Sequence, residues 1–551
     1  MKYRGINLPN TVCKMFNQPM TWLLHKRNYW TSKWKTGLMQ PTIRLHMDVC
    51  RVLCDMEGKG IKVDVEKLRQ IETDFRNEYI QLETDLQNLI VEFCGDTPIN
   101  LASGEDRSKL FYSLVVGDKK DWKTFFDLGT ELKDGKRKKK FVKVSPPRVF
   151  RSKYRHKVGA FLKTVRQVCN TCKGRGSVEF IRKDGTYGMP RKCKVCFGSG
   201  SVYKNLTERA GLGLTPLNEK DLSVHGFKTD VSTIREKILQ VRGQPRQYEF
   251  LRKYMRYNSL ATYLNTFIEN IKNNTGTDGF IHPQFMQCVT ATGRLSSRNP
   301  NFQNMPRSGT FPVREAIVSR FKGGKILEGD YSQLEFRVAG FLSQDPQALQ
   351  DIKDKIDVHA YTAEIIGVSR QEAKAHTFKP LYGGRTGTPS ERRYYEAFLE
   401  KYSGIARWHE KLGNEALVRK KITLPSGREY MFPNVRRFPS GGVSNGTQIK
   451  NYPVQGFATA DLLPVALVSL HKKIKENQIK SLICNTVHDS IVMDVHPEEE
   501  GIAIDLLTEA MLGIRKECKS RYGLKYNVPI GIELKIGDDW SNLKTVNVKE
   551  I

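Results

Sequence analysis

The chain has 551 residues, of which 90 are Lys or Arg and 59 are Asp or Glu, so its formal net charge is +31. At roughly 100–200 residues per domain, this length predicts about three or four domains. With 39% hydrophobic and 27% charged residues, the composition fits a globular protein and excludes long-range disorder. The excess of positive charge favours a polyanionic partner, with nucleic acid ahead of an anionic membrane surface.

No segment has the roughly 18–20 uninterrupted apolar residues of a membrane span, and the longest apolar run is Leu462–Leu470. The N-terminus lacks the apolar stretch of a secretory signal. The eleven cysteines are odd in number and mostly scattered, as in a reduced compartment. We therefore expect a cytoplasmic protein without a membrane partner.

The first half of the chain reads as two helical regions separated by an insertion. Residues 42–89 have helical periodicity that breaks at Gly58–Gly60 and resumes after Asp64, a plausible N-cap. Between 115 and 206 the composition shifts, with 25 Lys or Arg against 7 Asp or Glu, which predicts an insertion with its own small fold. Helical periodicity returns over 231–271.

The second half alternates strands and helices. Lys325–Gly329 reads as a buried strand that runs into Asp330, and helices are expected over 332–342 and 369–382. Residues 482–495 read as two short strands that turn at His488-Asp489. The pattern predicts an α+β core with a helical insert.

Two aspartates end up at strand ends in this pattern. Asp330 could simply precede a helix, because Ser332 and Glu335 are spaced as a capping box, and Asp489 could be an ordinary turn residue. Together, however, two aspartates at adjacent strand ends could hold two Mg²⁺ ions roughly 3.5–4 Å apart for phosphoryl transfer.

A second pattern repeats every four residues. On a continuous helix each step advances about 400°, so the four side chains would share one face. They are Arg370, Lys374, Phe378 and Tyr382. Cations suit a triphosphate and flat rings suit stacked bases. The alternative is an ordinary solvated helix whose two rings enter the core.

These segments resemble motifs A, B and C of the family A DNA polymerases, the family of bacterial DNA polymerase I. The matching motifs are Asp330-Tyr-Ser-Gln-Leu-Glu335, the Arg370–Gly383 helix and Val487-His-Asp489. Supporting segments follow in the same order, namely 290–297, 301–306, 451–456 and 528–540, with 56–64 earlier. The resemblance covers roughly residues 42–114 and 207–545.

The resemblance implies a right-hand polymerase with palm, fingers and thumb, a small zinc-binding insertion and no complete exonuclease domain. The expected parts are an N-terminal extension (1–41), a thumb (42–265, with the basic insertion 115–206 and a four-cysteine module 169–200), a first palm part (266–355), fingers (356–455) and a second palm part (456–551).

The resemblance also implies residue roles in DNA synthesis from deoxynucleoside triphosphates on a primer-template. Asp330 and Asp489, with the backbone of Tyr331, would bind two Mg²⁺, and Lys374 would donate a proton to pyrophosphate. Nucleotide-binding residues would be Tyr331, Gln333, Glu335, His359, Arg370, Lys374, Phe378 and Tyr382. DNA-binding residues would be Arg294, Gln303, Asn451, Gln455 and His488.

Four positions depart from the family pattern. Ser490 stands where Glu is usual, which puts a third carboxylate in doubt, and Thr447 stands where Arg is common. Pro380 removes a helical N–H, so we expect a kink and a more mobile Tyr382–Gly384 end. Phe378, in place of Tyr, implies discrimination against dideoxynucleotides.

The insertion contains two CxxCxGxG repeats. Their cysteines, with twenty residues between the inner pair, are Cys169, Cys172, Cys193 and Cys196. This spacing predicts one closed, structural zinc site, and the repeat resembles half of the DnaJ-type chaperone zinc domain. The basic run Lys136–Lys140 reads either as a solvated linker or as a grip on the phosphate backbone. We expect the insertion to aid processivity by holding DNA or recruiting a partner.

Only about 40 residues precede the expected thumb, so the sequence predicts no exonuclease in this chain and a separate exonuclease or processivity protein as a partner. The small size and the insertion suggest a bacteriophage enzyme that acts in the cytoplasm of a bacterial host. Two alternatives remain at this stage. One is a single-subunit RNA polymerase, against which Glu335 argues; the other is a catalytically idle DNA-binding scaffold, against which Asp330 and Asp489 argue.

Overall fold

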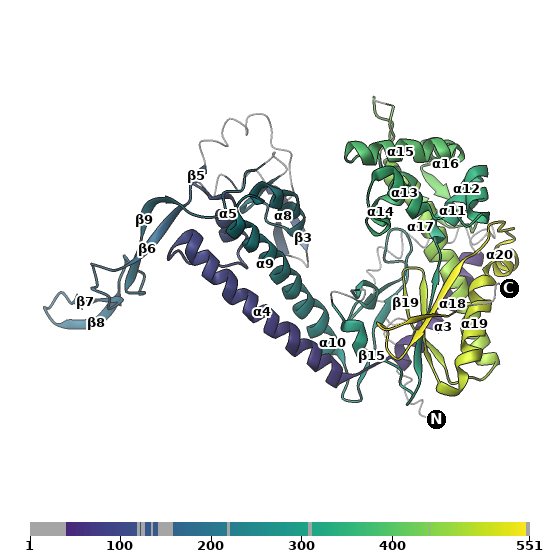
Figure 1. Ribbon diagram of the computed structural model, residues 1–551, viewed down its shortest axis with the longest axis horizontal. Helices are drawn as coiled ribbons and strands as arrows, with labels where there is room; N and C mark the ends of the chain where they lie inside the picture. The colour runs from purple at the N-terminus through teal and green to yellow at the C-terminus, as the bar shows by residue number, and fades with distance from the viewer. Residues whose placement is uncertain are drawn as a thin grey trace. The chain divides into compact units, whose positions relative to one another are not determined.

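The computed structural model describes residues 40–117, 119, 122, 127–133, 136–141, 158–216, 221–306, 311–439 and 441–546. They form two compact units: the described residues before Thr73 and after Leu264 form the first, and Thr73–Leu264 is the second (Figure 1). Both helices and sheets contribute, so the predicted α+β class is confirmed. The expected N-terminal extension lies outside the described residues, apart from its last two positions.

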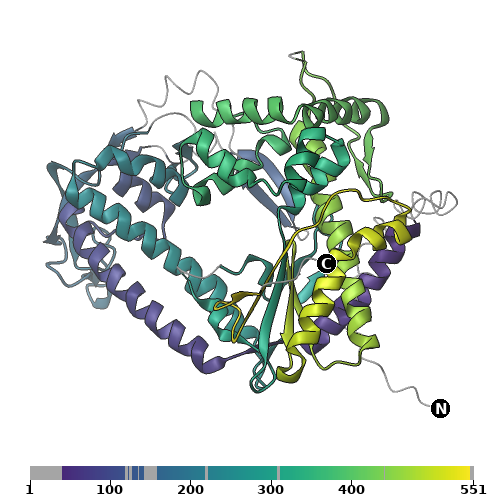
Figure 2. The ribbon, with the colours of Figure 1, turned by 45° about the vertical axis from the view of Figure 1, so that its right-hand side comes forward.

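A five-stranded antiparallel sheet is the centre of the first unit. Its spatial order is β19 (Leu482–Val487), β20 (Ser490–Val495), β16 (Lys325–Tyr331), β21 (Ile532–Gly537) and β22 (Lys544–Val546). The helices α18 (Leu463–Glu476) and α19 (Glu500–Leu512) cover one face, and α3 (Gln40–Lys59) packs beside α18 (Figure 2). The predicted strand before Asp330 and the predicted hairpin at His488-Asp489 are both confirmed.

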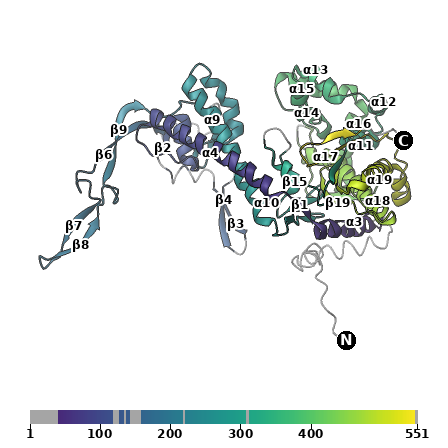
Figure 3. The ribbon, with the colours of Figure 1, turned by 60° about the horizontal axis from the view of Figure 1, so that its bottom comes forward.

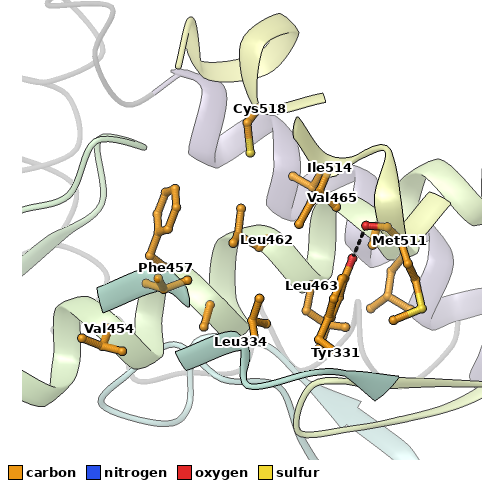
Figure 4. Close-up of a cluster of buried hydrophobic side chains, with 14 of the residues drawn as sticks. Tyr331, Leu334, Val454, Phe457, Leu462, Leu463, Val465, Met511, Ile514 and Cys518 are labelled. Atoms are coloured by element: carbon orange, nitrogen blue, oxygen red, sulfur yellow. Dashed lines mark hydrogen bonds between the residues drawn. The ribbon is translucent and has the colours of Figure 1, made fainter. Parts of the chain in front are cut away.

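The core between sheet and helices determines where Asp330 points. Tyr331 is fully buried, and its hydroxyl donates a hydrogen bond to the Met511 carbonyl at 2.9 Å, among apolar side chains from α18 and α19 (Figure 4). Gly329 lies equally close to the helices, because a Cβ there would meet Met511 Sδ at 2.7 Å. Since side chains alternate along a strand, Asp330 between them faces the opposite side of the sheet.

The remaining elements of this unit are mostly helical. The helices are α10 (Glu269–Asn274), α11 (Leu334–Ser343), α12 (Pro346–Lys353), α13 (Val358–Ile366), α14 (Arg370–Thr377), α15 (Pro389–Lys401), α16 (Ser403–Arg419), α17 (Gly446–Gly456) and α20 (Ile514–Tyr522). Short strands are β1 (Ile61–Val63) with β12 (Phe280–Ile281) and β15 (Ile317–Val318), β13 (Gln284–Met286) with β14 (Ser296–Arg298), and β17 (Lys421–Thr423) with β18 (Glu429–Met431).

Two sequence expectations about helices need correction. The helix expected over 369–382 ends at Thr377 and gives way to a separate 3₁₀ turn, Pro380–Tyr382, as the missing N–H of Pro380 requires. The predicted break is therefore confirmed, but the single continuous face of four side chains is wrong. The helix expected from Ser332 begins two residues later, at Leu334.

One helical stretch, Gly446–Glu476, is long and apolar enough to cross a membrane by length and composition alone. It joins α17, a π-helical turn at Phe457–Leu462, and α18. Of its most apolar window, 83% is buried inside the protein, so its apolar surface is already covered by the core.

The second unit is built on two long antiparallel helices. The helix α4 (Val65–Cys94) follows Asp64, whose carboxylate accepts from the Lys67 N–H at 2.9 Å as an N-cap does. Ion pairs join α4 to α9 (Pro245–Thr262): Glu92 with Arg246, Asp85 with Lys253 and Glu78 with Arg256. A separate aromatic-rich core lies with them, under α5 (Gly104–Tyr112) and α8 (Val231–Lys237).

The expected insertion is a series of β-hairpins in this unit (Figure 3). The strands pair as β2 (Leu114–Val116) with β5 (Val158–Ala160), β3 (Asp127–Lys133) with β4 (Lys136–Phe141), β6 (Leu162–Val168) with β9 (Ser201–Arg209), and β7 (Ser177–Ile181) with β8 (Tyr187–Lys192). A further pair, β10 (Leu222–Ser223) with β11 (Gly226–Phe227), follows after the expected insertion. We call β6–β9 with the enclosed cysteine turns the arm. The basic run Lys136–Lys140 belongs to a paired strand, so the linker interpretation is wrong.

Candidate active site and four-cysteine module

Asp330 and Asp489 meet at one edge of the five-stranded sheet. Asp489 follows β19 in the tight turn before β20, where His488 has a φ of 57°. The Tyr331 N–H reaches the Asp489 carbonyl at 3.4 Å, and the two aspartate side chains share a hydrogen bond. The structure therefore brings together the two residues that the sequence placed at adjacent strand ends.

The pKa of Asp489 is raised to about 6, first by burial and then by the negative charge of Glu335, while Arg294 and the hydrogen bond with Asp330 act against the rise. Close carboxyl groups that cannot both ionise easily are typical of sites that take up cations. Carboxylate oxygens are also the ligands that Mg²⁺ prefers. The donor set thus fits the divalent metal implied by the sequence.

The sheet places further polar groups beside Asp330. Its direct cross-strand neighbours are Ser490 on β20 and Glu533 on β21, and directly opposed residues share one face. A cavity of about 230 Å³ opens on this face. Its lining includes Asp330, Glu328, Glu533, Lys535, Trp540 and Arg314.

Apart from Asp330, sequence reasoning missed these cavity residues, although Glu328 on β16 and Glu533 and Lys535 on β21 follow the alternation of a strand. The Trp540 indole donates to Glu328 at 3.0 Å, and the Arg314 guanidinium lies 4.1 Å from the Trp540 ring centroid. The signal was the period of two in Glu328-Gly-Asp330 and Glu533-Leu-Lys535, which predicts a shared polar face once the strands are known to be adjacent.

Glu335 lies in the first turn of α11 and forms an ion pair with Arg294 rather than a helix cap. Gln333 adopts a left-handed conformation, with φ 52°, at the helix start, and no side chain caps the helix. The capping-box alternative for Ser332 and Glu335 is therefore wrong. Burial raises the pKa of Glu335, and Arg294, which also donates to Thr459 at 3.3 Å, opposes the rise.

Arg370 and Lys374 both lie on the short helix α14, but they differ in their ion pairing. Arg370 donates to Asp357 at 2.6 Å, whereas Lys374 is exposed, and no ion pair is found for it among the described residues. Asp357 also caps α13 by accepting from the backbone N–H of His359 at 3.0 Å. Sequence analysis missed Asp357, whose place before an apolar helical run was an N-cap signal.

His359, in the first turn of α13, lies next to Phe378, which follows α14. His359 Nδ1 lies 3.0 Å from the Thr377 hydroxyl, and its ring centroid is 5.2 Å from that of Phe378. Burial lowers the pKa of His359, so the ring is neutral near pH 7. Tyr382 is separated from this group by the break at Pro380, and its buried hydroxyl finds no hydrogen-bond partner among the described residues.

The expected DNA-contact residues fall in three places. Gln303 donates to the Thr486 carbonyl of β19 at 3.3 Å, and His488 forms the turn at the end of that strand. Asn451 and Gln455 are four residues apart on α17 and share a face. Arg294 is the residue paired with Glu335. Their contacts with DNA remain predictions.

The four cysteines of the insertion form a second cluster, at the join between the two hairpins of the arm. Their sulfur atoms all lie within 4.8 Å of one another, and the residues are Cys169, Cys172, Cys193 and Cys196. Pairs across the two turns are 3.8 Å apart (Cys169–Cys193) and 3.5 Å apart (Cys172–Cys196). The predicted convergence of the two CxxC motifs is confirmed.

The two turns that carry the cysteines are related by an internal repeat. The Gly176 N–H donates to Cys172 Sγ at 3.3 Å, and the Gly200 N–H donates to Cys196 Sγ at the same distance. A Cβ on Gly176 would lie 2.4 Å from a backbone oxygen of the other turn, which explains the need for glycine.

Two of these thiols have pKa values shifted in opposite directions when no cation is bound. Burial raises the pKa of Cys172 to about 11, whereas for Cys196 backbone and thiol hydrogen bonds overcome burial and lower the pKa to about 6. The four groups therefore do not ionise together unaided. Four thiolates at this spacing fit a tetrahedral metal ion such as zinc, with no open position for catalysis.

Comparisons with known proteins show the family to which the chain belongs. A family model described as DNA polymerase family A matches residues 212–542, more than half of the chain. DNA polymerase I of Lactococcus lactis subsp. cremoris is 31% identical over 317 residues, which are 53% of this chain and 34% of the relative. The thermostable DNA polymerase I of Thermus filiformis is 31% identical over 355 residues, 60% of this chain and 40% of that one.

The chain thus spans about a third of the length of the Lactococcus relative. Among solved structures, the POL domain of Pol1 from M. smegmatis, in complex with DNA primer-template and dNTP, superposes with a TM-score of 0.61 at 20% identity. The match covers 90% of this chain and 70% of that one, and shows that the fold is shared. The chain belongs to DNA polymerase family A.

Proposed function

We propose that the protein is a template-directed DNA polymerase that adds deoxynucleotides to the 3′ end of a primer. The observation that carries the proposal is the contact between Asp330 and Asp489, beside the pair formed by Glu335 and Arg294. Membership of family A and the primer-template bound to the M. smegmatis domain support it. In this reading the five-stranded sheet is the palm, α12–α16 belong to the fingers and Thr73–Leu264 is most of the thumb.

Two Mg²⁺ would be held by Asp330, Asp489 and the Tyr331 carbonyl, and would stabilise charge on the attacking and leaving oxygens. Burial favours this binding, because it makes two adjacent carboxylates costly unless a cation neutralises them. Glu335, held by Arg294, occupies the first turn of α11, where it would exclude a ribose 2′-OH.

The α14 residues act on the nucleotide. Lys374 is exposed and available to bind the triphosphate and to hold the proton that pyrophosphate takes up. Arg370 must exchange Asp357 for phosphate oxygens, so Asp357 holds this guanidinium in place before the nucleotide arrives. Phe378 would stack on the incoming base and Tyr382 would lie at the template position.

Primer extension tests this proposal. The wild-type protein with Mg²⁺ should extend a labelled primer on a DNA template with deoxynucleotides and far less well with ribonucleotides. Faster extension with ribonucleotides would instead support an RNA polymerase. Normal DNA binding without any extension would support an idle scaffold.

We further propose that the four-cysteine module binds one structural zinc ion and that the arm helps the enzyme to hold DNA. The thiol geometry and the glycine N–H donors support the metal, and the basic composition of residues 115–206 supports the DNA contact. Metal analysis of the purified protein should find one zinc per chain. Cys172→Ser should abolish it, whereas the exposed-cysteine variant Cys288→Ser should retain it.

A further inference from the structure

The tip of the arm has two aromatic side chains that are mostly exposed. Phe197 is 78% exposed and Tyr187 is 71% exposed, although aromatic residues generally gain stability by burial. Phe197 also has a φ of 50°, a conformation that is unfavourable for a bulky side chain. A ring that is mostly exposed in a turn with an unfavourable backbone conformation has no evident role in the stability of the arm.

The two cysteine turns carry different side chains at one equivalent position. Lys173 follows Cys172 in the first turn as Phe197 follows Cys196 in the second, and both have a φ of 50°. The two turns therefore present a cation and a ring from equivalent backbone positions. The metal cluster needs neither side chain, because the cysteines and the glycine N–H groups complete it.

A cation lies beside one of the exposed rings. Lys192 extends beside the second turn, because a Cβ on Gly198, next to Phe197, would lie 2.5 Å from its Cε. Lys192 faces Ser177 across the β7–β8 hairpin, and four residues further along β7 Ile181 faces Tyr187 on the same side. Residues 158–209 contain 11 Lys or Arg and 3 Asp or Glu. The tip is thus a positive surface with accessible rings.

We propose that this surface, formed by Phe197, Lys192 and Tyr187, is a stacking platform for single-stranded nucleic acid. The inference rests on the proposed function and specifies which form of DNA the arm holds. Single strands offer both a polyanionic backbone and the free faces of bases, whereas a duplex keeps its base faces stacked inside. An acidic protein partner would match the charge but would not require flat rings.

The test uses the full-length protein, fluorescein-labelled oligothymidylate and the same label on a blunt duplex, with fluorescence anisotropy as readout. Phe197→Ala should weaken oligothymidylate binding about tenfold, as expected for loss of one stacked base, and should leave duplex binding unchanged. Phe197→Trp should bind at least as tightly, and the added tryptophan fluorescence should be quenched by oligothymidylate. Lys192→Ala should weaken the binding of both the oligothymidylate and the duplex.

Matched controls separate stacking from other causes. Val418→Ala removes an apolar side chain that is 82% exposed elsewhere in the chain, and should change neither affinity. Phe197→Leu keeps an apolar contact but loses the ring, so it should behave like Phe197→Ala. Zinc content should equal that of the wild type in every variant.

The inference is overturned if Phe197→Ala and the double variant with Tyr187→Ala bind oligothymidylate as the wild type does. It is also overturned if Phe197→Leu retains full affinity, a result that would point to a protein partner. Primer extension on a short primed template is measured with the same preparations. Absence of extension by the wild type would refute the proposed function, whereas normal extension with unchanged affinities would refute the stacking platform alone.

Discussion

The acidic site and the cysteine module both hold like-charged groups close together, but they differ in how much apolar core supports them. Each gathers groups that repel one another when ionised: Asp330 comes from a strand and Asp489 from a turn, whereas all four cysteines come from two turns. Asp330 and Asp489, however, stand on a five-stranded sheet packed against a large apolar core. Among the described residues, the apolar side chains packed against the cysteines are Val178 and Val202. We therefore expect the acidic site to keep its fold without a metal ion, and the cysteine module to lose its fold without one.

The largest expected effect comes from removing an aspartate from the acidic site. Asp330→Ala should reduce primer extension by about a thousandfold or more, because several kcal/mol of transition-state stabilisation are lost. Thermal stability should be unchanged or higher, since burial of like charges is relieved. Steady-state extension rates and a thermal melt measure the two effects.

Asp505→Ala, at an exposed position of α19, is the matched control and should extend primers normally. If Asp330→Ala extended primers at the wild-type rate, the acidic site would not be the catalytic centre.

Metal removal from the module should produce a large but local effect. Cys172→Ser, or a zinc chelator, should expose residues 158–209 to proteolysis because the arm tip has almost no apolar core of its own. The main thermal transition should stay in place. Limited proteolysis with mass spectrometry locates the cuts, and protection of the arm in the variant would mean that it folds without metal.

A smaller effect is expected at the rim of the acidic site. Glu335→Ala should raise ribonucleotide relative to deoxynucleotide incorporation by about 10- to 100-fold, since one steric and polar contact is worth a few kcal/mol at most. The ratio of kcat/KM values measures this selectivity. Glu364→Ala, exposed on α13, should leave the ratio unchanged, and an unchanged ratio in both variants would remove Glu335 from sugar selection.

The smallest effect concerns pH and the break at Pro380. Burial, with help from Lys450, lowers the pKa of His409 to about 3, and its Nε2 lies 2.9 Å from the Leu381 carbonyl. The unfolded chain, with a pKa near 6.5, binds more protons between these values. The contribution of neutral His409 to the free energy of unfolding is therefore complete above pH 6.5. It is lost as pH falls toward 3, by up to about 1.4 kcal/mol per pH unit.

Urea unfolding at pH 7 and pH 5 measures this loss. His409→Gln keeps a hydrogen-bond donor but does not titrate, so its stability should fall less between the two pH values. Equal losses in both proteins would show that His409 is charged when folded.

Much of the sheet, the aspartate pair and the cysteine cluster could be predicted because the signals are local. The strand before Asp330, the hairpin at Asp489 and the two CxxC turns each depend on a few adjacent residues. The break at Pro380 was predictable for the same reason, but the helix end at Thr377 was not, because the residue at which a helix ends depends on its tertiary contacts.

What sequence reasoning missed depends on pairing between distant segments. Arg370 meets Asp357, and Asp330 meets Glu533, only after helices and strands have packed. Glu335 was read as a possible cap because Ser332 is near in sequence, whereas Arg294, 41 residues away, is its partner. Local signals in the sequence mark Asp357 as an N-cap and Glu533 as part of a polar strand face, but they do not say which distant residue each one meets.

The central position of β16 has a consequence for how this gene can change. Asp330 is in register with Ser490 on one side and Glu533 on the other, and Gly329 beneath it leaves room for Met511. Inserting or deleting one residue in this strand would turn the aspartate toward the apolar helices and a tyrosine toward the substrate. Point substitutions in this strand can have effects of any size. A single-codon insertion or deletion would remove activity altogether, so we expect homologous strands to align without gaps.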